Sequence, residues 1–376
     1  MIKLTPAMGW NSWNTFGADI NEQVIMESAD AMVEQGLLEC GYEYLVIDDC
    51  WSLRERDENG RLVPDPVKLP HGMKYNAVYV HSKGLKFGMY SCAGNLTCAC
   101  YPGSYEHEFI DAETFAEWEV DLLKHDYCFH SPIVDGKYLY RRMGLALENC
   151  GRDILFSACS WGADGTKEWI KETSASIWRS TRDHMDSWES VKKVMRQQDE
   201  MLPYNGVGCF NDMDMLIVGM YGKGNAALGG CTDTQYKTHF SLWAFMGSPL
   251  MIGCDIRNMN QVTKDILMKK ELIEINQDPG CRQPVRLGGH NVGEDLLMYS
   301  KQLSNGDLAI GFFNMSDDIA TARLNLDWVG LPHSTGKTLE MKELWTGEEI
   351  RVTNSAILKN LHPHDCVVYR AKVVNQ

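Results

Sequence analysis

Short apolar runs alternate with helical stretches through the first three quarters of the chain. Asn21 can cap a helix whose apolar residues recur at helical spacing up to residue 37, and the mostly apolar run at 42–49 predicts a buried strand. Further strands are expected at residues 6–10, 86–91, 120–126, 154–160, 176–183, 208–216 and 249–255, and further helices at 78–82, 112–119, 138–150, 187–201 and 233–246. Eight strand–helix units of this kind predict a parallel sheet that closes into a (β/α)₈ TIM barrel.

An open, doubly wound sheet is the alternative architecture. It would carry a phosphate-binding glycine loop after an early strand. Gly222, Gly224 and Ala227 fit the loose form of that fingerprint, but they come late in the chain and open no βαβ unit of the required kind. We therefore do not expect an oxidoreductase that binds a dinucleotide.

The pattern changes after residue 279. Segments 296–300 and 308–313, joined by a turn at 304–307, predict a β-hairpin. Further short strands are expected at residues 323–326, 341–344 and 366–369. The chain is therefore expected to divide into a barrel at residues 1–281 and an antiparallel β-sandwich domain at residues 282–376.

Composition and charge narrow the range of binding partners that the protein is expected to have. The 376 residues are 44% hydrophobic and 23% charged, and the net charge of −15 argues against nucleic acid or an anionic membrane as a partner. The first residues lack the apolar core of a secretory signal, so we expect a cytoplasmic protein with most of its 13 cysteines as thiols, with a mature exported chain as the alternative. The most apolar stretch, 240–256, is interrupted by Ser248, Pro249 and Gly253, which favours a buried helix and strand over a membrane span. The sequence does not decide whether the chain forms a homo-oligomer.

Among the predicted strands that end in an aspartate, two are the clearest candidates for chemistry. Asp126 and Asp183 stand at the carboxyl ends of their strands, where a parallel barrel places its reactive groups. Lys124 lies two residues before Asp126 on the same face, and its charge favours the ionised carboxylate that a nucleophile needs. An ion pair that only lines the barrel is the alternative. Two carboxylates that face one substrate are the minimum equipment of a glycosidase, with Asp183 as the proton donor.

Other strand ends carry polar or aromatic groups. Asp48 and Asp49 end the second predicted strand, where they can bind neighbouring hydroxyls of a sugar or, alternatively, hold a calcium ion or cap a helix. Trp10 ends the first strand and can form an apolar platform under a sugar ring, although a lone tryptophan is more often part of a core. Asp212 and Asp214 supply a further carboxylate pair at the seventh strand.

Motifs for metal binding and for other nucleophiles are missing from the sequence. Cys92, Cys98 and Cys100 follow the third strand at a spacing that matches no standard zinc pattern. The chain has no His-Glu-x-x-His motif, no P-loop and no nucleophile elbow. We therefore expect no metal, no cofactor, and neither serine hydrolase nor metalloprotease chemistry.

Together these segments resemble family 27 of the glycoside hydrolases, the α-galactosidase and α-N-acetylgalactosaminidase family. The matching stretches follow the family's order, at residues 8–13, 42–51, 71–72, 79–86, 121–128, 178–188, 211–219 and 275–279. The resemblance implies a retaining, exo-acting enzyme for a small molecule or glycan that ends in an α-linked, galacto-configured sugar. Asp126 matches the nucleophile and Asp183 the general acid/base, and Asp48 and Asp49 match the pair that binds the 4- and 6-hydroxyls. Further pocket positions of the family match Trp10, Tyr90, Lys124, Arg179, Asp214 and Met215, and Cys98 and Cys128 match a disulfide that joins two active-site loops.

Three positions depart from the family's pattern. His125 stands before the nucleophile in place of the usual aromatic residue, and Met213 replaces a proline. After the fifth strand, α-galactosidases carry a glutamate that binds the 2-hydroxyl, whereas this chain has Ser160, with Ala163 three residues on. These small residues resemble the N-acetylgalactosaminidase branch and leave room for a 2-acetamido group, so we predict α-N-acetylgalactosaminidase activity. An α-galactosidase is the alternative, and a galactoside-binding module without turnover is a remote one.

Overall fold

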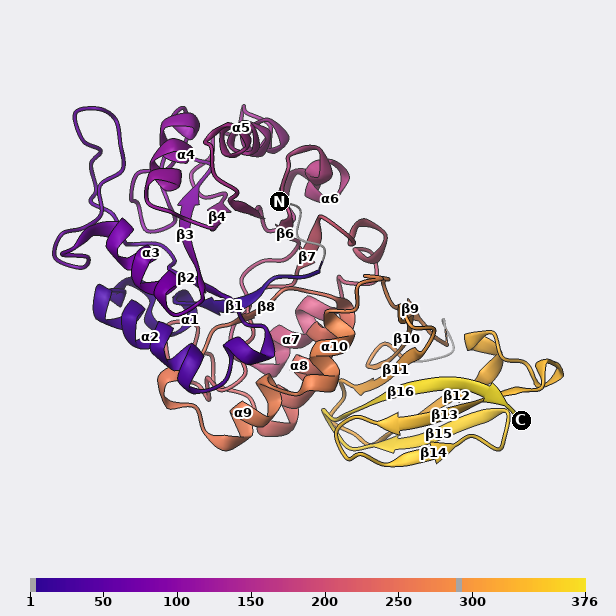
Figure 1. Ribbon diagram of the computed structural model, residues 1–376. Coiled ribbons are helices and arrows are strands. Elements are labelled where there is room, and N and C mark those ends of the chain that lie inside the picture. Colours follow the sequence, from indigo (N-terminus) through magenta and orange to yellow (C-terminus); the bar gives the residue numbers. More distant parts are fainter. Residues whose placement is uncertain (1–4, 289–292) are drawn as a thin grey trace.

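A barrel of parallel strands is followed by an antiparallel β domain (Figure 1). The computed structural model describes residues 5–288 and 293–376. Residues 1–4, where our expectation about a secretory signal begins, lie outside the described residues, as do residues 289–292.

Eight parallel strands form the barrel sheet, in the order β7-β6-β5-β4-β3-β2-β1-β8. They are β1 (Met8–Asn11), β2 (Tyr44–Val46), β3 (Lys86–Cys92), β4 (Leu122–Asp126), β5 (Leu155–Cys159), β6 (Ile177–Arg179), β7 (Phe210–Asp212) and β8 (Leu250–Ile252). The circle closes just beyond β7, where Leu216 N–H donates to Met251 O over 2.7 Å and Gly253 N–H donates to Leu216 O over 2.9 Å. The predicted (β/α)₈ barrel is therefore confirmed.

Helices cover the outside of the barrel (Figure 1). They are α1 (Trp13–Phe16), α2 (Glu22–Glu34), α3 (Gly72–Ser82), α4 (Glu108–Glu117), α5 (Gly136–Asn149), α6 (Thr166–Trp169), α7 (Trp188–Met195), α8 (Asp233–Met246), α9 (Gln261–Leu267) and α10 (Lys270–Asn276). Asn21 caps α2 as predicted, because its side chain accepts the N–H of Val24. In the described residues, no helix has both the length and the apolar character needed to cross a membrane.

Several elements are shorter than predicted, including β2, β6 and β8, and two further ones show a physical reason. The helix expected at 187–201 ends at Met195, and the chain continues in turns toward Pro203, which cannot donate to a helix ladder. The strand expected at 208–216 keeps only β7, because Asp214 adopts a left-handed conformation with φ +76° that takes the chain out of the sheet.

Alternation along the strands separates the barrel interior from the layer under the helices. Leu122 and Tyr44 belong to a small apolar cluster contributed by the barrel strands, whereas Leu123 belongs to the large core that includes helix residues. Successive side chains of a strand point to opposite faces. Lys124 and Asp126 therefore share the interior face with Leu122, at the carboxyl end of β4.

The C-terminal domain pairs a six-stranded antiparallel sheet, in the order β14-β13-β16-β11-β10-β9, with the two-stranded sheet β12-β15. The strands are β9 (Val285–Arg286), β10 (Leu296–Gln302), β11 (Leu308–Asn314), β12 (Ala320–Asn325), β13 (Lys337–Glu343), β14 (Glu349–Arg351), β15 (Ala356–Leu361) and β16 (Cys366–Asn375). Apolar residues of both sheets, such as Phe312 and Leu324, form one buried cluster, as in a β-sandwich. The ring of Phe313 packs edge-on against Phe245 of α8, with centroids 5.9 Å apart, and so joins the sandwich to the barrel. The boundary that we expect after residue 281 lies between α10 and β9.

Strands β1 and β2 approach each other so closely at Gly9 that a side chain there would clash. A Cβ built on Gly9 would lie 2.3 Å from the carbonyl oxygen of Tyr44, its partner in the β1–β2 register. We expect Gly9→Ala to lower the free energy of unfolding, measured by urea denaturation, by about 1–3 kcal/mol, because a paired backbone cannot give way.

Gly293→Ala is the matched control, since a Cβ there meets nothing within 4 Å. Its stability should stay within about 0.5 kcal/mol of the parent protein. Equal stabilities of the two variants would contradict the expectation.

Candidate active site

Polar residues from the carboxyl ends of the barrel strands meet in one cavity of about 210 Å³. It is lined by Trp13, Asn14, Asp48, Asp49, Tyr90, Cys98, Lys124, Asp126, Arg179, Asp183, His184, Met185, Asp214, Met215, Asn225 and Ala226. All of the predicted site residues except Trp10, Cys128, Ser160 and Ala163 belong to this lining. Residues from β2, β3, β4 and β6 and from the segments that follow them thus converge where a barrel places its chemistry.

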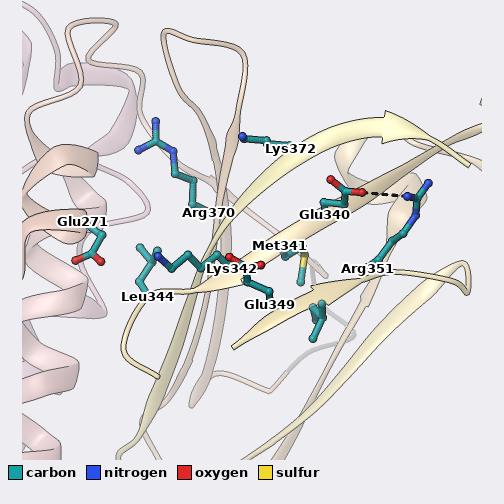
Figure 2. Close-up of a pocket in the computed structure, with 10 residues that line it drawn as sticks. Glu271, Glu340, Met341, Lys342, Leu344, Glu349, Arg351, Arg370 and Lys372 are labelled. Carbon is teal, nitrogen blue, oxygen red and sulfur yellow. Dashed lines mark hydrogen bonds and ion pairs between the residues drawn. The ribbon is translucent and has the colours of Figure 1, made fainter. Parts of the chain in front are cut away.

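A larger groove, of about 530 Å³, lies on the C-terminal domain (Figure 2). Figure 2 shows most of its side chains on the β-strands, Glu271 on the neighbouring helix, and an ion pair between Glu340 and Arg351. Lys342 and Arg370 add further charges to the lining. This lining has charges of both signs but no aromatic ring on which a sugar could stack. We therefore place the active site in the barrel.

Asp48 is the centre of a buried hydrogen-bond network. Asn11 Nδ2 and Lys124 Nζ each donate to Asp48 Oδ2 over 2.8 Å. Burial alone would lower the pKa of Lys124, but the negative charge of Asp48 raises it above its ordinary value, so the ammonium stays protonated. The neighbouring Asp49 accepts the N–H of Ala99 over 3.0 Å. Both carboxylates are held in fixed directions, with lone pairs left for the hydroxyls of a ligand.

Tyr90 lies beside Lys124 in the β3–β4 register. The ammonium of Lys124 lies 5.3 Å from the centroid of the Tyr90 ring. In the part of the chain that the structure describes, the buried Tyr90 hydroxyl has no hydrogen-bond partner. A buried polar group of this kind usually has a partner, and a ligand hydroxyl in the cavity can supply one.

Asp126 ends β4 and is 6% exposed. Its Oδ1 accepts the N–H of Tyr127 over 2.8 Å. Burial raises the pKa of Asp126 to about 6, against the opposing charge of Lys124. The lysine that we expect to keep this carboxylate ionised therefore acts only in part, because desolvation outweighs it. The ionised form still dominates at neutral pH.

Asp183 lies four residues beyond the end of β6, and its side chain is 73% exposed. Arg179 Nη2 donates to Asp183 Oδ1 over 3.1 Å and to Asp214 Oδ2 over 2.6 Å. Asp186, three residues on, is fully buried and accepts the hydroxyl of Tyr236 over 2.8 Å. Of Asp183 and Asp186, Asp183 is the one that lines the cavity, and its side chain is open to solvent.

Asp214 is fixed by contacts from several elements. Besides Arg179, the N–H of His184 donates to its carboxylate over 2.6 Å, and Trp243 Nε1–H donates to its carbonyl oxygen over 2.8 Å. These contacts hold the left-handed backbone, which aspartate tolerates better than most residues. Met215, which follows, reaches the cavity beside it.

Trp10 does not reach the cavity. Its ring is fully buried in the core, and its Nε1–H donates to Cys254 O over 2.9 Å. Asn11, the next residue, contacts Asp48 on the interior face, so alternation turns Trp10 toward the helices. The structure thus corrects the predicted platform: Trp13 lines the cavity instead.

Ser160 and Ala163 also lie outside the lining of the cavity. Ser160 is fully buried, and its Oγ lies 2.6 Å from Thr166 Oγ1. The N–H of Ala163 donates to Ser160 O over 2.9 Å, in the turn that leads to α6. The hydroxyl that we expect to meet a 2-acetamido group is therefore already hydrogen-bonded within the protein.

Cys98 and Cys128 form a disulfide, with their Cα atoms 5.2 Å apart. The bond joins the segment after β3 to the segment after β4. Cys98 lines the cavity, whereas Cys128 is not part of its lining. The other cysteines of the described residues are not disulfide-bonded.

Several lining residues have no counterpart among the predicted ones. They are Trp13, Asn14, His184, Met185, Asn225 and Ala226. Direct adjacency to Asp183 could have revealed His184. Asn225 and Ala226 come from the long segment between β7 and α8, where the N–H of Ala226 donates to Asn14 O over 2.9 Å. No local pattern marks a contact between segments so far apart in the sequence.

Known families match almost the whole chain. The family described as Alpha galactosidase A matches residues 5–278, and the one described as Alpha galactosidase C-terminal beta sandwich domain matches residues 293–371. The chain belongs to glycoside hydrolase family 27. It is therefore a glycoside hydrolase.

Individual relatives and solved structures of family 27 agree with this assignment. The chain is 42% identical to Alpha-galactosidase 3 of Arabidopsis thaliana over 366 residues, which cover 97% of this chain and 81% of the relative. A putative α-galactosidase/melibiase from Bacteroides fragilis is 39% identical, with a TM-score of 0.92 over 98% of this chain and 79% of that one. α-Galactosidase I from Mortierella vinacea is 32% identical, with a TM-score of 0.91 over 98% of this chain and 97% of that one.

Arg179→Met tests the buried ion pair. At neutral pH the variant leaves the Asp214 carboxylate buried without its cation, so we expect the free energy of unfolding to fall by about 3–5 kcal/mol. Burial raises the pKa of Asp214 to about 6 even beside Arg179. Without the arginine, the pKa of Asp214 in the folded protein rises further above its value in the unfolded chain. A raised folded-state pKa makes the free energy of unfolding fall with rising pH until that pKa is passed. The parent protein therefore stops losing stability above about pH 6, whereas the variant continues to lose it.

Urea denaturation between about pH 5 and 8 measures this difference, which should grow above about pH 6. The double variant Arg179→Met/Asp214→Asn is the control, because an amide in place of the carboxylate removes the pH dependence of the difference. A deficit of the single variant that stays constant with pH would show that the pair does not control the ionisation of Asp214.

Proposed function

We propose that the protein is a retaining exo-α-galactosidase, which hydrolyses terminal α-linked galactose from small oligosaccharides or glycans. The observation that carries the proposal is that Asp126 and Asp183, from different strands, line one cavity together with the fixed pair Asp48 and Asp49. Relatives that match nearly the whole chain are named α-galactosidases. A Saccharomyces cerevisiae α-galactosidase, 28% identical to this chain, has been solved with raffinose.

The two carboxyl groups have the different environments that double displacement needs. In the first step the Asp126 carboxylate attacks the anomeric carbon, while Asp183 gives its proton to the departing glycosidic oxygen. In the second step Asp183 takes a proton from water, whose oxygen attacks the anomeric carbon and releases Asp126. Asp126 is buried but ionised at neutral pH, and the exposed side chain of Asp183 is open to the water that attacks in the second step.

Recognition of the galacto configuration rests on the buried charges around the cavity. Asp48 and Asp49 accept the sugar's 4- and 6-hydroxyls, and Lys124 holds Asp48 in place over a 2.8 Å contact. A site built to hydrogen-bond a hydroxyl discriminates strongly against an analogue that cannot reach it, because its own buried groups are then left unpaired. The 4-epimer of galactose moves one of these hydroxyls away.

An α-N-acetylgalactosaminidase is the second candidate, favoured by Ser160 and Ala163 in place of a bulky glutamate motif. The internal hydrogen bond of Ser160, its full burial and the names of the relatives weigh toward plain α-galactosides. A putative α-N-acetylgalactosaminidase from Bacillus halodurans, 23% identical, shares the fold. A binding module without turnover would not need both Asp126 and Asp183 in one cavity.

Comparing kcat/KM for p-nitrophenyl α-galactoside and its N-acetylgalactosaminide distinguishes the two candidates. We expect the plain galactoside to be hydrolysed roughly 10–200-fold faster, because Ser160 and Ala163 are not part of the lining of the cavity, where they would have to contact the extra group. The p-nitrophenyl α-glucoside is the control for configuration and should not be turned over. Faster hydrolysis of the N-acetylgalactosaminide would assign the second candidate.

Variants of the two acids test the proposed roles. Asp126→Asn should abolish hydrolysis without unfolding the protein, since the amide fills the same space but cannot attack. Asp183→Ala should slow hydrolysis of the p-nitrophenyl galactoside by about 10²–10⁴-fold. Azide should then rescue it by attacking the galactosyl-enzyme, giving α-galactosyl azide, which NMR identifies.

Glu340→Gln, in the groove of Figure 2, is the matched carboxylate control and should leave activity unchanged. Full activity of Asp126→Asn would exclude Asp126 as the nucleophile. A β-galactosyl azide from Asp183→Ala would exclude retention with these roles.

A further inference from the structure

The disulfide lies directly against the carboxylate of Asp126. The Sγ atoms of Cys98 and Cys128 and a carboxylate oxygen of Asp126 all lie within 4.8 Å of one another. We propose that reduction of this disulfide creates an inhibitory metal site, in which Cys98, Cys128 and Asp126 bind a thiophilic divalent cation such as Zn²⁺ or Cd²⁺.

The segment around Cys128 keeps its position without the disulfide. The N–H of Ala93 donates to Asp126 O over 2.9 Å, and the N–H of Asn95 donates to Phe129 O over 3.3 Å. The two backbones are in direct contact, because a Cβ built on Gly94 would lie 2.0 Å from Cys128 O. These contacts flank Cys128 on both sides and do not involve its sulfur.

The segment around Cys98 is also held independently of the sulfur. The N–H of Ala99 donates to Asp49 Oδ2 over 3.0 Å, and the N–H of Thr97 donates to Tyr101 O over 2.8 Å. Arg54 Nη1 donates to Ala99 O over 3.2 Å. After reduction, both cysteines are therefore expected to remain beside Asp126.

Reduction converts one S–S bond into two thiols. A dithiol such as dithiothreitol supplies the two electrons and two protons and becomes a cyclic disulfide. When a metal binds, both thiols release their protons and coordinate as thiolates, which suit soft and borderline cations. Two sulfurs and one carboxylate oxygen supply three ligands of a tetrahedral site, and the fourth position opens toward the cavity that Cys98 lines.

The bound cation blocks hydrolysis because it occupies the carboxylate of Asp126, which must attack the sugar. The oxidised protein has no thiolates at this position and therefore no site. The metal has no part in hydrolysis itself, so this proposal goes beyond the proposed function. It makes the activity depend jointly on the redox state and on the free metal concentration.

The test uses the full chain, reduced with excess dithiothreitol and then freed of it under argon, and Cd²⁺ as the probe. We expect one equivalent of Cd²⁺ to produce the ultraviolet absorption of cadmium–thiolate bonds. Hydrolysis of p-nitrophenyl α-galactoside should fall at least about tenfold, since two thiolates hold the metal on Asp126. EDTA should reverse both effects, and the unreduced protein should show neither.

Cys98→Ser and Cys128→Ser should each lose the absorption change and the sensitivity to Cd²⁺, judged against the rate of the same variant without metal. Cys100→Ser is the matched control, because Cys100 is an exposed free thiol two residues from Cys98. It should keep both responses.

Two results would overturn the proposal: an absorption change in Cys98→Ser equal to that of the reduced parent protein, or Cd²⁺ binding at these thiols without loss of hydrolysis. The absorption change does not depend on turnover, so it reports on a variant that hydrolyses slowly. It would also persist if the sugar specificity proposed above were wrong, and the two proposals therefore fail separately.

Discussion

Charges buried at the carboxyl ends of the strands must be paired, and this requirement organises the active site. Lys124 of β4 pairs with Asp48 after β2, and Arg179 of β6 pairs with Asp214 after β7. Each pair ties together the ends of two strands that share the cavity. Because an unpaired buried charge is strongly destabilising, neither end can move alone. On the proposed function, the groups that bind the sugar's hydroxyls are thereby fixed before a sugar arrives, which lowers the ordering that binding requires.

Asp126 lies buried beside these pairs but has no short ion pair of its own among the described residues. Lys124 makes its short contact with Asp48, and burial therefore prevails at Asp126, whose pKa is raised to about 6. A carboxylate that is buried and incompletely compensated is more reactive toward an electron-poor carbon than one held in a tight ion pair. Asp183 has the opposite environment, with an exposed side chain and a single longer contact to Arg179. The different roles proposed for the two acids thus follow from the pairing of Lys124 with Asp48 and of Arg179 with Asp214.

Periodicity was enough to predict the barrel, the β domain and Asp126 at the end of β4, because those features depend on local alternation. Asp183 does not end its strand as expected, since β6 stops at Arg179, four residues earlier. Periodicity did not predict which aromatic residue lines the cavity, since that depends on which of the two neighbouring positions 10 and 11 faces inward. Asn11 takes the interior face, so Trp10 enters the core and Trp13 reaches the cavity. Ser160 shows a related difficulty: its hydroxyl contacts Thr166 and lies outside the lining of the cavity, which the small size of the residue does not reveal. No local sequence pattern could have predicted that Asn225 lines the cavity.

The Cys98–Cys128 bond adds little to the positions of the loops that it joins. The hydrogen bonds from Ala93 N–H to Asp126 O and from Ala99 N–H to the Asp49 carboxylate already hold them. Its main consequence on our proposal is chemical. Two sulfurs within metal-binding distance of a carboxylate would compete for any available thiophilic cation, and a nucleophile must keep its lone pair free. Joining the sulfurs to each other removes that competition while leaving the backbone where the hydrogen bonds hold it.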